Sequence, residues 1–194
     1  MKCLTNTMLF MVFIMSHSIA SGHQKYEDMI IQQSNLKCID YNLALAIVEA
    51  ESNFRPKVIS YKGALGLGQV TILVAKDRLG YSQKDKTTNE KVRRMLLDPH
   101  QNIRIMLMHL EWINKHLSSF FEGVSRIQMI AAVYNAGYIG FVNSKKRLPQ
   151  IGEGHKPLEP AKKRERDGYI KKVVKAYHRF VKKNNLSDCS LSKI

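Results

Sequence analysis

The sequence is poor in cysteine, proline and acidic residues, and these shortages exclude several classes of protein. Three cysteines in 194 residues exclude a small scaffold held together by many disulfides. Five prolines and 11 glycines exclude collagen-like and proline-rich fibres. The apolar content of 44% argues against a disordered chain, and the length fits one domain with its own core.

No apolar stretch is long enough to cross a bilayer, which requires about 20 residues. The longest comes early, in residues 8–15 (MLFMVFIM), after Lys2 and before the small residues Ser18 and Ala20. This order is typical of a secretory signal peptide, so we expect residues 1–20 to be removed by cleavage after Ala20. An uncleaved membrane anchor is the alternative. After cleavage no transmembrane segment remains, and we expect a periplasmic or secreted protein.

The cysteines that remain after this cleavage are Cys38 and Cys189, near the two ends of the mature chain. In an oxidising compartment such a pair can form one disulfide between the C-terminal tail and the body of the domain. Two unpaired thiols are an equally open alternative, because the sequence does not place the side chains in space. No CxxC or HxxxH spacing accompanies the two cysteines, so the sequence predicts no metal site.

Acidic residues number 16 against 31 lysines and arginines, and the imbalance is largest toward the C-terminus. Residues 145–194 contain 15 basic residues and 5 acidic ones. A basic segment favours an anionic partner such as lipid headgroups, an acidic wall polymer or nucleic acid. Nucleic acid is the least favoured, since few aromatic side chains are present there to stack on bases. A solvated helix face in a lysine-rich protein is the alternative.

Helical patterns account for most of the remaining sequence. Asp40, Thr71, the pair Asp98-Pro99 and Ser125 are typical helix starts, and the apolar residues after them recur three or four positions apart. A last amphipathic helix is predicted around residues 169–180. Because strand-like alternation is nearly absent, the sequence predicts a mainly α fold. We expect a single domain with at most a very small β excursion.

One acidic side chain, Glu51, lies on an otherwise apolar helix face. Residues seven apart in a helix differ by about 20°, which places Glu51 in line with Ala44 and near Ile47 and Val48. Glu49 lies about 160° away and is expected to face solvent. Burial raises the pKa of a carboxyl group, which can then give a proton to a leaving oxygen. A Glu held by a backbone or arginine partner is the alternative, and this pattern alone favours it.

Two further segments combine glycine with polar side chains. In residues 60–69 (SYKGALGLGQ), three glycines let the backbone come close to a partner, and the backbone amides with Ser60 and Gln69 suit neutral hydroxyl and acetamido groups. The spacing lacks the phosphate-loop pattern. Residues 131–137 (AAVYNAG) bring Tyr134 and Asn135 to the end of a helix. The alternatives are a tight turn before a helix and an ordinary capped helix.

In their order and spacing, these segments resemble the catalytic domain of soluble lytic murein transglycosylases. The pieces that carry the resemblance are Glu51-Ser52, Ser60-x-x-Gly63-Ala64-x-Gly66-Leu67-x-Gln69 and Tyr134-Asn135-Ala136-Gly137. Two supporting pieces, similar to further family segments, are Asp98-Pro99-x-x-Asn102-Ile103 and Glu165-x-x-x-Tyr169-Ile170. The resemblance implies a lysozyme-like α fold in residues 36–182. The other expected parts are the signal peptide at 1–20, an N-terminal lead segment at 21–35 and a basic C-terminal tail at 183–194.

The resemblance implies cleavage of the β-1,4 bond between N-acetylmuramic acid and N-acetylglucosamine, with peptidoglycan glycan strands as the partner. Glu51 is implied to be the single catalytic acid and base, with a 1,6-anhydromuramic product and without a metal or organic cofactor. The next acidic residue after Glu51 is Asp77, so no obvious second carboxylate is present for a two-carboxylate mechanism. The residues implied to line the sugar site are Ser60, Gly66, Gln69, Tyr134, Asn135 and, with its phenol near Glu51, Tyr169.

This sequence departs from the family pattern at several positions. Gly68 stands where the family usually has Met, Arg166 replaces Thr, and Met106 and His109 stand where Gly and Tyr are common. These departures affect the shape of the groove more than the identity of the acid. A catalytically silent, exported murein-binding module and a lysozyme-type hydrolase on the same fold stay open as alternatives. By analogy with small exported members of the family, a secretion or pilus assembly is an expected partner, and no nucleic acid is expected.

Overall fold

The structure is a computed structural model that describes residues 22–117, 125–137 and 160–184. The predicted signal peptide and Cys189 lie outside these residues, so the cleavage and the disulfide stay predictions. Cys38 is exposed. Within the described part of the chain, no helix has both the length and the apolar character needed to cross a bilayer.

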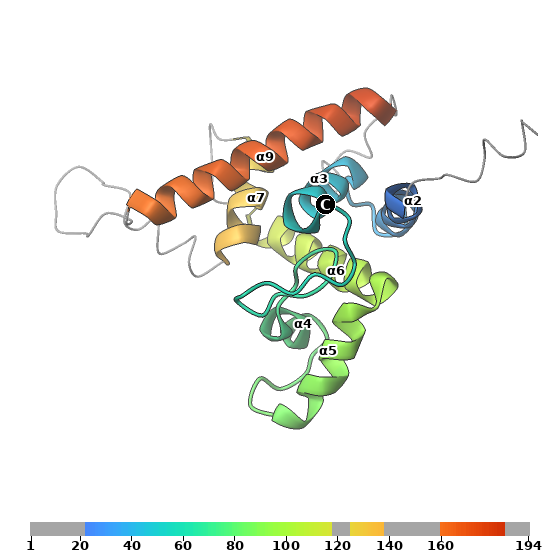
Figure 1. The fold of residues 1–194 in the computed structure, drawn as a ribbon, viewed down its shortest axis with the longest axis vertical. Coiled ribbons are helices and arrows are strands. Elements are labelled where there is room, and N and C mark those ends of the chain that lie inside the picture. Colours follow the sequence, from blue (N-terminus) through green and yellow to red (C-terminus); the bar gives the residue numbers. More distant parts are fainter. Residues whose placement is uncertain (1–21, 118–124, 138–159, 185–194) are drawn as a thin grey trace, which may run out of the picture.

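Helices make up nearly all of the regular structure (Figure 1). Their bounds are α2 Gly22–Asn35, α3 Tyr41–Ser52, α4 Ile72–Arg78, the 3₁₀ helix η1 Lys86–Thr88, α5 Asn89–Leu97, α6 Pro99–Leu117, α7 Arg126–Ala136 and α9 Pro160–Asn184. The β excursion consists of two isolated bridges, from Leu65 to Ile59 and to Val70, and the described residues contain no longer strand. The predicted mainly α class is confirmed.

Helix α3 lies at the centre of the fold and packs against both α2 and α9 (Figure 1). Its predicted N-cap is confirmed, since Oδ1 of Asp40 accepts hydrogen bonds from the backbone amides of Asn42 and Leu43. Every side chain from Tyr41 to Val48 is buried. The expectation of one apolar stripe was therefore too narrow, because neighbouring helices cover α3 on more than one side.

Helix α6 begins where the sequence predicts it. Oδ1 of Asp98 accepts a hydrogen bond of 2.9 Å from the amide of Gln101, in the first turn. The predicted apolar stripe of α6 is confirmed, with buried Ile103, Met106, Leu107, Leu110, Ile113 and Leu117. Helices α4 and α5 pack against α6 and form the lower part of the molecule in Figure 1, and the loop that leads from α3 to α4 lies above them.

Helix α9 is the longest helix described and runs along the upper edge of the fold, packed on α3 and α7 (Figure 1). Its inner face buries Tyr169, Val173, Ala176 and Phe180. The predicted lead segment is largely α2, which packs against α3 and α6. Helix α9 itself runs to Asn184, so most of the predicted basic tail lies outside the described residues and the domain boundaries stay predictions.

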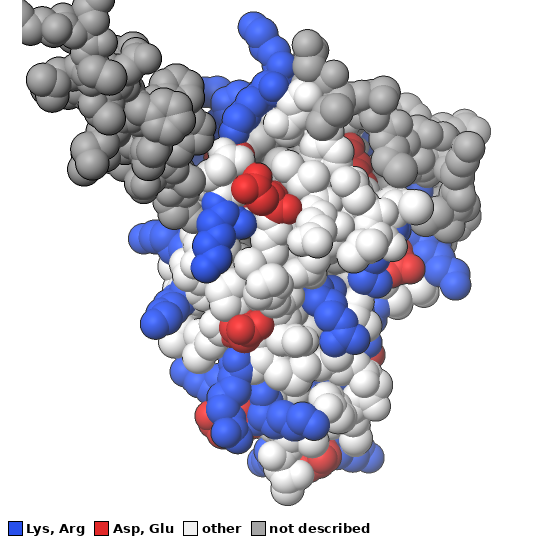
Figure 2. Space-filling view, turned by 90° about the vertical axis from the view of Figure 1, so that its right-hand side faces the viewer, with Lys and Arg blue, Asp and Glu red and all other residues white. Residues whose placement is uncertain are grey.

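Basic side chains are spread widely over the surface. Figure 2 shows one face of the molecule, on which Lys and Arg occur over the whole height and Asp and Glu are fewer. Ion pairs within the described residues include Lys37 with Glu111, at 3.5 Å, and Lys183 with Glu27, at 2.7 Å. Since the net charge is +15, such pairs compensate only a part of the basic excess.

Candidate active site

The Glu51 side chain lies in the last turn of α3 and is partly buried under α9. The Tyr169 hydroxyl of α9 donates a hydrogen bond of 2.7 Å to Oε1 of Glu51. Burial raises the pKa of Glu51 to about 7, and the hydrogen bond from Tyr169 acts in the opposite direction. Near neutral pH this carboxyl group is therefore present in both its acid and its base form. The partner is a tyrosine, and not the backbone group or arginine that the local pattern favours.

The chain turns sharply after Glu51. Asn53 ends α3 in the left-handed conformation, with φ of 50°, and Phe54 follows with φ of 58°. A phenylalanine is strained in this conformation, and tertiary packing holds it there. Its ring is only 4% exposed and lies edge-on to Phe180 of α9, with ring centroids 6.4 Å apart. The turn sends the chain from Glu51 directly into the loop formed by residues 57–70.

Tyr134 of α7 connects this loop to the region around Glu51. Its hydroxyl donates a hydrogen bond of 2.6 Å to the carbonyl oxygen of Gly68. Burial, and secondly the charge of Glu51, raise the pKa of Tyr134 well above its ordinary value. The same two causes, in the same order, raise the pKa of Tyr169. Two neutral phenols therefore lie near the Glu51 carboxyl group, and one of them, Tyr134, is bonded to the glycine loop.

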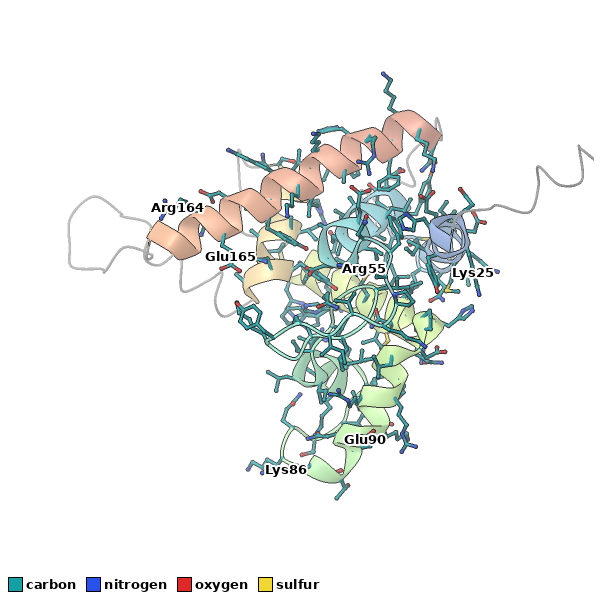
Figure 3. All side chains as sticks on the ribbon, in the orientation of Figure 1. Lys25, Arg55, Lys86, Glu90, Arg164 and Glu165 are labelled. Atoms are coloured by element: carbon teal, nitrogen blue, oxygen red, sulfur yellow. The ribbon has the colours of Figure 1, made fainter. Side chains whose placement is uncertain are left out.

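The side chains of Ser60 and Gln69 form hydrogen bonds within the loop itself. The Ser60 hydroxyl oxygen accepts a hydrogen bond of 3.0 Å from the amide of Ala64. The Gln69 amide nitrogen donates to the carbonyls of Val58 and Gly66, at 3.0 and 2.9 Å. These contacts hold the loop in one shape. Lys62 at its tip lies 3.9 Å from Glu165, so the loop and α9 approach each other (Figure 3).

The buried side-chain amide of Asn102, on α6, holds the loop through hydrogen bonds. Its Nδ2 donates to the carbonyls of Leu65 and Leu96, at 2.8 and 2.7 Å, and its Oδ1 accepts from the amide of Gly68 at 2.8 Å. Gly66 has φ of 74°, and a Cβ added there would collide with Asn102 and with the Leu96 carbonyl. The structure thus gives Gly66 a structural reason to be glycine.

From the sequence, Asn102 was predicted only as part of a family motif, and its hydrogen bonds to the loop were missed. An asparagine on the apolar stripe of a predicted core helix was the signal available, because buried amides are normally hydrogen-bonded on both sides. Asn135, which was predicted to line the site, is exposed at the C-terminal end of α7.

Gly68 and Met106, which both depart from the family pattern, are in contact in the structure. A Cβ built on Gly68 would lie 2.8 Å from both Cγ and Sδ of Met106, so the methionine fills the space above the glycine. The ring of His109, one turn further along α6, has its centroid 5.5 Å from that of Tyr134. Burial, and secondly the charge of Arg78, lower the pKa of His109 to about 4. His109 is thus a neutral neighbour of Tyr134 at neutral pH.

The hydrogen bond between the two site residues has a consequence for titration. Replacement of Tyr169 by Phe is expected to raise the pKa of Glu51 above about 7, because the phenol stabilises the ionised carboxylate. An NMR titration of the Glu51 carboxyl carbon measures the pKa. Tyr81→Phe is the matched control and is expected to leave the titration unchanged. A lower pKa in Tyr169→Phe would contradict the arrangement.

No metal is indicated by the side chains of the site. Among the described residues, no group of three or more His, Cys, Asp or Glu side chains could hold a metal ion. The chemistry available here is that of one carboxyl group with a pKa near neutrality, two phenols and backbone groups of a rigid loop. Such a set can transfer protons to and from a neutral substrate.

Comparison with known families identifies the domain. The family model for the Transglycosylase SLT domain matches residues 28–155. The chain belongs to this family. The match covers α3, the loop with its glycines and Tyr134, and it confirms the resemblance drawn from the short motifs. Tyr169 lies beyond the matched residues.

Curated relatives include two proteins named membrane-bound lytic murein transglycosylase C. The protein from Salmonella typhi is 35% identical over 114 residues, which is 58% of this chain and 31% of the relative. The protein from Photorhabdus laumondii is 34% identical over 132 residues, or 66% of this chain and 36% of the relative. The chain therefore spans about a third of the length of these relatives.

Two solved structures of SLT enzymes share the fold. The 70 kDa soluble lytic transglycosylase of Escherichia coli has a TM-score of 0.56 and 26% identity, and the match covers 86% of this chain and 25% of that chain. An inactive mutant of the lytic transglycosylase Slt from Pseudomonas aeruginosa has a TM-score of 0.57 and 17% identity, over 84% of this chain and 25% of that chain. The lysozyme-like SLT fold is thereby confirmed.

Proposed function

We propose that the protein is a lytic transglycosylase that cleaves the glycan strands of peptidoglycan. One observation carries the proposal: the partly buried Glu51 carboxyl accepts a hydrogen bond from Tyr169 and has a pKa of about 7, inside an SLT domain. An acid with a pKa near the working pH is suited to give a proton and take one back in the same reaction. The names of the relatives support the same activity.

The proposed bond is the β-1,4 linkage between N-acetylmuramic acid and N-acetylglucosamine. Protonated Glu51 gives its proton to the glycosidic oxygen as the bond from this oxygen to C1 breaks. The muramoyl N-acetyl group shields the positive charge that develops at C1. The Glu51 carboxylate then takes the proton of the muramoyl C6 hydroxyl, whose oxygen closes on C1. The product is a 1,6-anhydro ring, and no water is added.

A single carboxylate is enough for this sequence of steps, because the nucleophile belongs to the substrate. Glycosidases with two carboxylates place them about 5–9.5 Å apart across the scissile bond. Among the described residues, no second carboxylate contributes to the pKa shift of Glu51, Tyr134 or Tyr169. This supports a mechanism in which Glu51 is both acid and base.

The neighbours of Glu51 have proposed roles in holding it and the sugar. Tyr169 fixes the orientation of the Glu51 carboxyl through the hydrogen bond of 2.7 Å. Tyr134 holds the loop at Gly68, so that its backbone forms one side of the sugar site. The remaining proposed contacts to the sugar come from Ser60, Gly66, Gln69 and Asn135.

The products released from purified sacculi test the reaction. Mass spectrometry is expected to find muropeptides that end in anhydromuramic acid, each lighter by one water than the corresponding lysozyme product. Reducing muramic ends would show that the protein is a hydrolase on the same fold. Binding to sacculi without release of any fragment would support a silent murein-binding module instead.

The pKa of Glu51 predicts the pH dependence of the reaction. Only the protonated form starts the reaction, so kcat/KM is expected to fall about tenfold per pH unit above about 7. An exposed glutamate titrates near 4.3, and an uncoupled exposed acid would lose activity already above that pH. The profile is measured on soluble glycan strands at constant ionic strength. An alkaline limb near pH 5 would contradict the raised pKa.

We also propose that the protein works outside the cytoplasm, where peptidoglycan lies. The basis is the predicted leader of residues 1–20, with cleavage after Ala20. Mass spectrometry of the protein recovered from the periplasm or medium would show whether its first residue is Ser21. Association with a secretion or pilus assembly stays a prediction.

A further inference from the structure

A groove lies at the C-terminal end of α3, on the side of this helix away from Glu51. It is a groove of about 330 Å³ between the last turn of α3 and the middle of α9. The residues that line this cationic groove are Glu49, Ala50, Asn53, Lys172, Lys175, Ala176 and Arg179. Its volume is in the range of small-ligand sites.

The charges in the groove come from one side of α9. Residues 168–184 contain six lysines and arginines and no acidic residue. With 100° per residue, Lys172, Lys175 and Arg179 fall on the same side of α9, next to its buried face. The opposite side of α9 carries the partly buried Ile170 and Tyr177. The groove therefore meets the most basic side of α9, next to the buried face of this helix.

Pairing inside the groove leaves an excess of positive charge. Arg179 pairs with Glu49, the only acidic residue of the lining, which is why Glu49 does not face solvent freely as the helix pattern suggested. Lys172 and Lys175 are exposed and make no ion pair with any acidic residue of the described chain. A ligand that enters the groove thus meets two free ammonium groups.

We propose that the cationic groove binds the carboxylates of the peptide stems that branch from muramic acid. The proposal rests on the proposed function and names which part of the substrate the groove takes. Lysines act as point charges that attract a carboxylate without fixing its orientation, which suits a flexible peptide. Arg179, which could bind a phosphate through its planar fork, is already engaged by Glu49.

The groove and Glu51 lie at the same end of α3, on different sides of this helix. Glu49 and Ala50 immediately precede Glu51 in α3, and Lys172 follows Tyr169 by three residues, about 4.5 Å along the axis of α9. An extended peptide advances about 3.5 Å per residue. Because Glu49 and Glu51 project about 160° apart, a stem also has to pass the width of a helix, about 10 Å, which three or more extended residues span.

The test compares glycan strands that carry their stems with the same strands after removal of the stems by an amidase. For the full-length protein, KM is expected to be about tenfold lower for the stem-bearing strands at low salt. In Lys172→Gln/Lys175→Gln the KM for stem-bearing strands rises to that of stripped strands, and the stripped strands are cleaved as before. The difference shrinks at high ionic strength.

The matched control is Lys171→Gln/Lys182→Gln, which removes the same charge from the same helix outside the groove. It is expected to retain the preference for stems. Equal loss in both double variants, loss of stripped-strand cleavage in the groove variant, or no preference in the wild type would overturn the proposal. The protein could also bind phosphatidylglycerol vesicles and lose this binding only in the groove variant, with unchanged KM values. This result would overturn the proposal and show that the groove binds a membrane surface instead of a stem.

A direct binding measurement separates this proposal from the proposed function. If the wild type releases no product from either substrate, the transglycosylase proposal fails, but the groove can still be judged. Fluorescence anisotropy with a labelled stem peptide is then measured on the wild type and on Lys172→Gln/Lys175→Gln. About tenfold weaker binding by the variant supports the groove, and equal binding overturns it.

Discussion

Replacement of Glu51 by Gln is expected to reduce the release of anhydromuropeptides from sacculi by about a thousandfold or more. The change keeps the size of the side chain and lets it accept a hydrogen bond from Tyr169, but removes the proton that starts the reaction and the base that completes it. A positioned acid or base contributes about 10²–10⁴-fold, and here one group performs both steps.

The stability of Glu51→Gln distinguishes lost chemistry from lost folding. The native pKa of Glu51, about 7, lies above the value of 4.5 for an unperturbed side chain. The folded state therefore binds the proton more tightly than the unfolded state. The contribution of Glu51 to the free energy of unfolding is fully present below pH 4.5 and is lost as the pH rises through about 7. At pH 8 the neutral amide avoids this penalty, so Glu51→Gln is expected to be more stable than wild type by up to about 3 kcal/mol.

Urea unfolding at pH 8 and sacculus digestion are measured on the same samples. Glu111→Gln, on the surface of α6 and paired with Lys37, is the matched control and is expected to keep its activity. If Glu51→Gln keeps more than a tenth of the wild-type rate, another group supplies the proton. If it loses both stability and activity, the carboxyl group is structural.

Replacement of Asn102 by Ala is expected to lower the free energy of unfolding by about 3–5 kcal/mol. The side chain is completely buried and makes three hydrogen bonds to backbone groups of Leu65, Leu96 and Gly68. Its removal leaves the Gly68 amide and the Leu96 carbonyl without this partner, whereas the Leu65 carbonyl keeps a hydrogen bond from the Val70 amide. Each buried unpaired group costs about 1–3 kcal/mol, to which the loss of the buried side chain adds. Activity is expected to fall as well, because Gly68 also holds the Tyr134 hydroxyl.

Urea unfolding measures this loss against a second asparagine of the same helix. Asn114 is also buried, but within the described residues its amide oxygen accepts from the Arg126 side chain, which can turn to water when the amide is removed. Asn114→Ala is therefore expected to cost about 1 kcal/mol. A loss in Asn102→Ala no larger than in Asn114→Ala would show that the loop keeps its shape without the buried amide.

Much of the helical framework could be predicted from the sequence, because helix starts and apolar periodicity are local properties. Asp40 and Asp98 cap the helices that the sequence assigns to them, and the stripe along α6 is buried as expected. Both patterns depend on the chain within a few residues, and the folded structure did not override them. The prediction for α3 was less accurate, because its neighbours bury almost every side of it.

The candidate acid could also be located from the sequence, but its surroundings could not. Helical spacing put Glu51 near apolar residues, whereas the identity of its hydrogen-bond partner came only from the family resemblance. Tyr169 lies 118 residues further along the chain, and no local pattern connects the two. Glu49 was predicted to face solvent, but its carboxylate pairs with Arg179 on α9, a contact that the helix pattern of α3 does not contain.

The sequence alone determined the helices, the excess of basic residues and the order of motifs that places the chain in the SLT family. These properties are set by spacing along the chain and by composition. Only the tertiary structure decided that Asn102 braces the glycine loop, that Met106 fills the space above Gly68, and that Lys172 and Lys175 line a groove at the C-terminal end of α3. Each of these depends on which helix packs against which, because contacts between distant segments follow from the packing of the whole core.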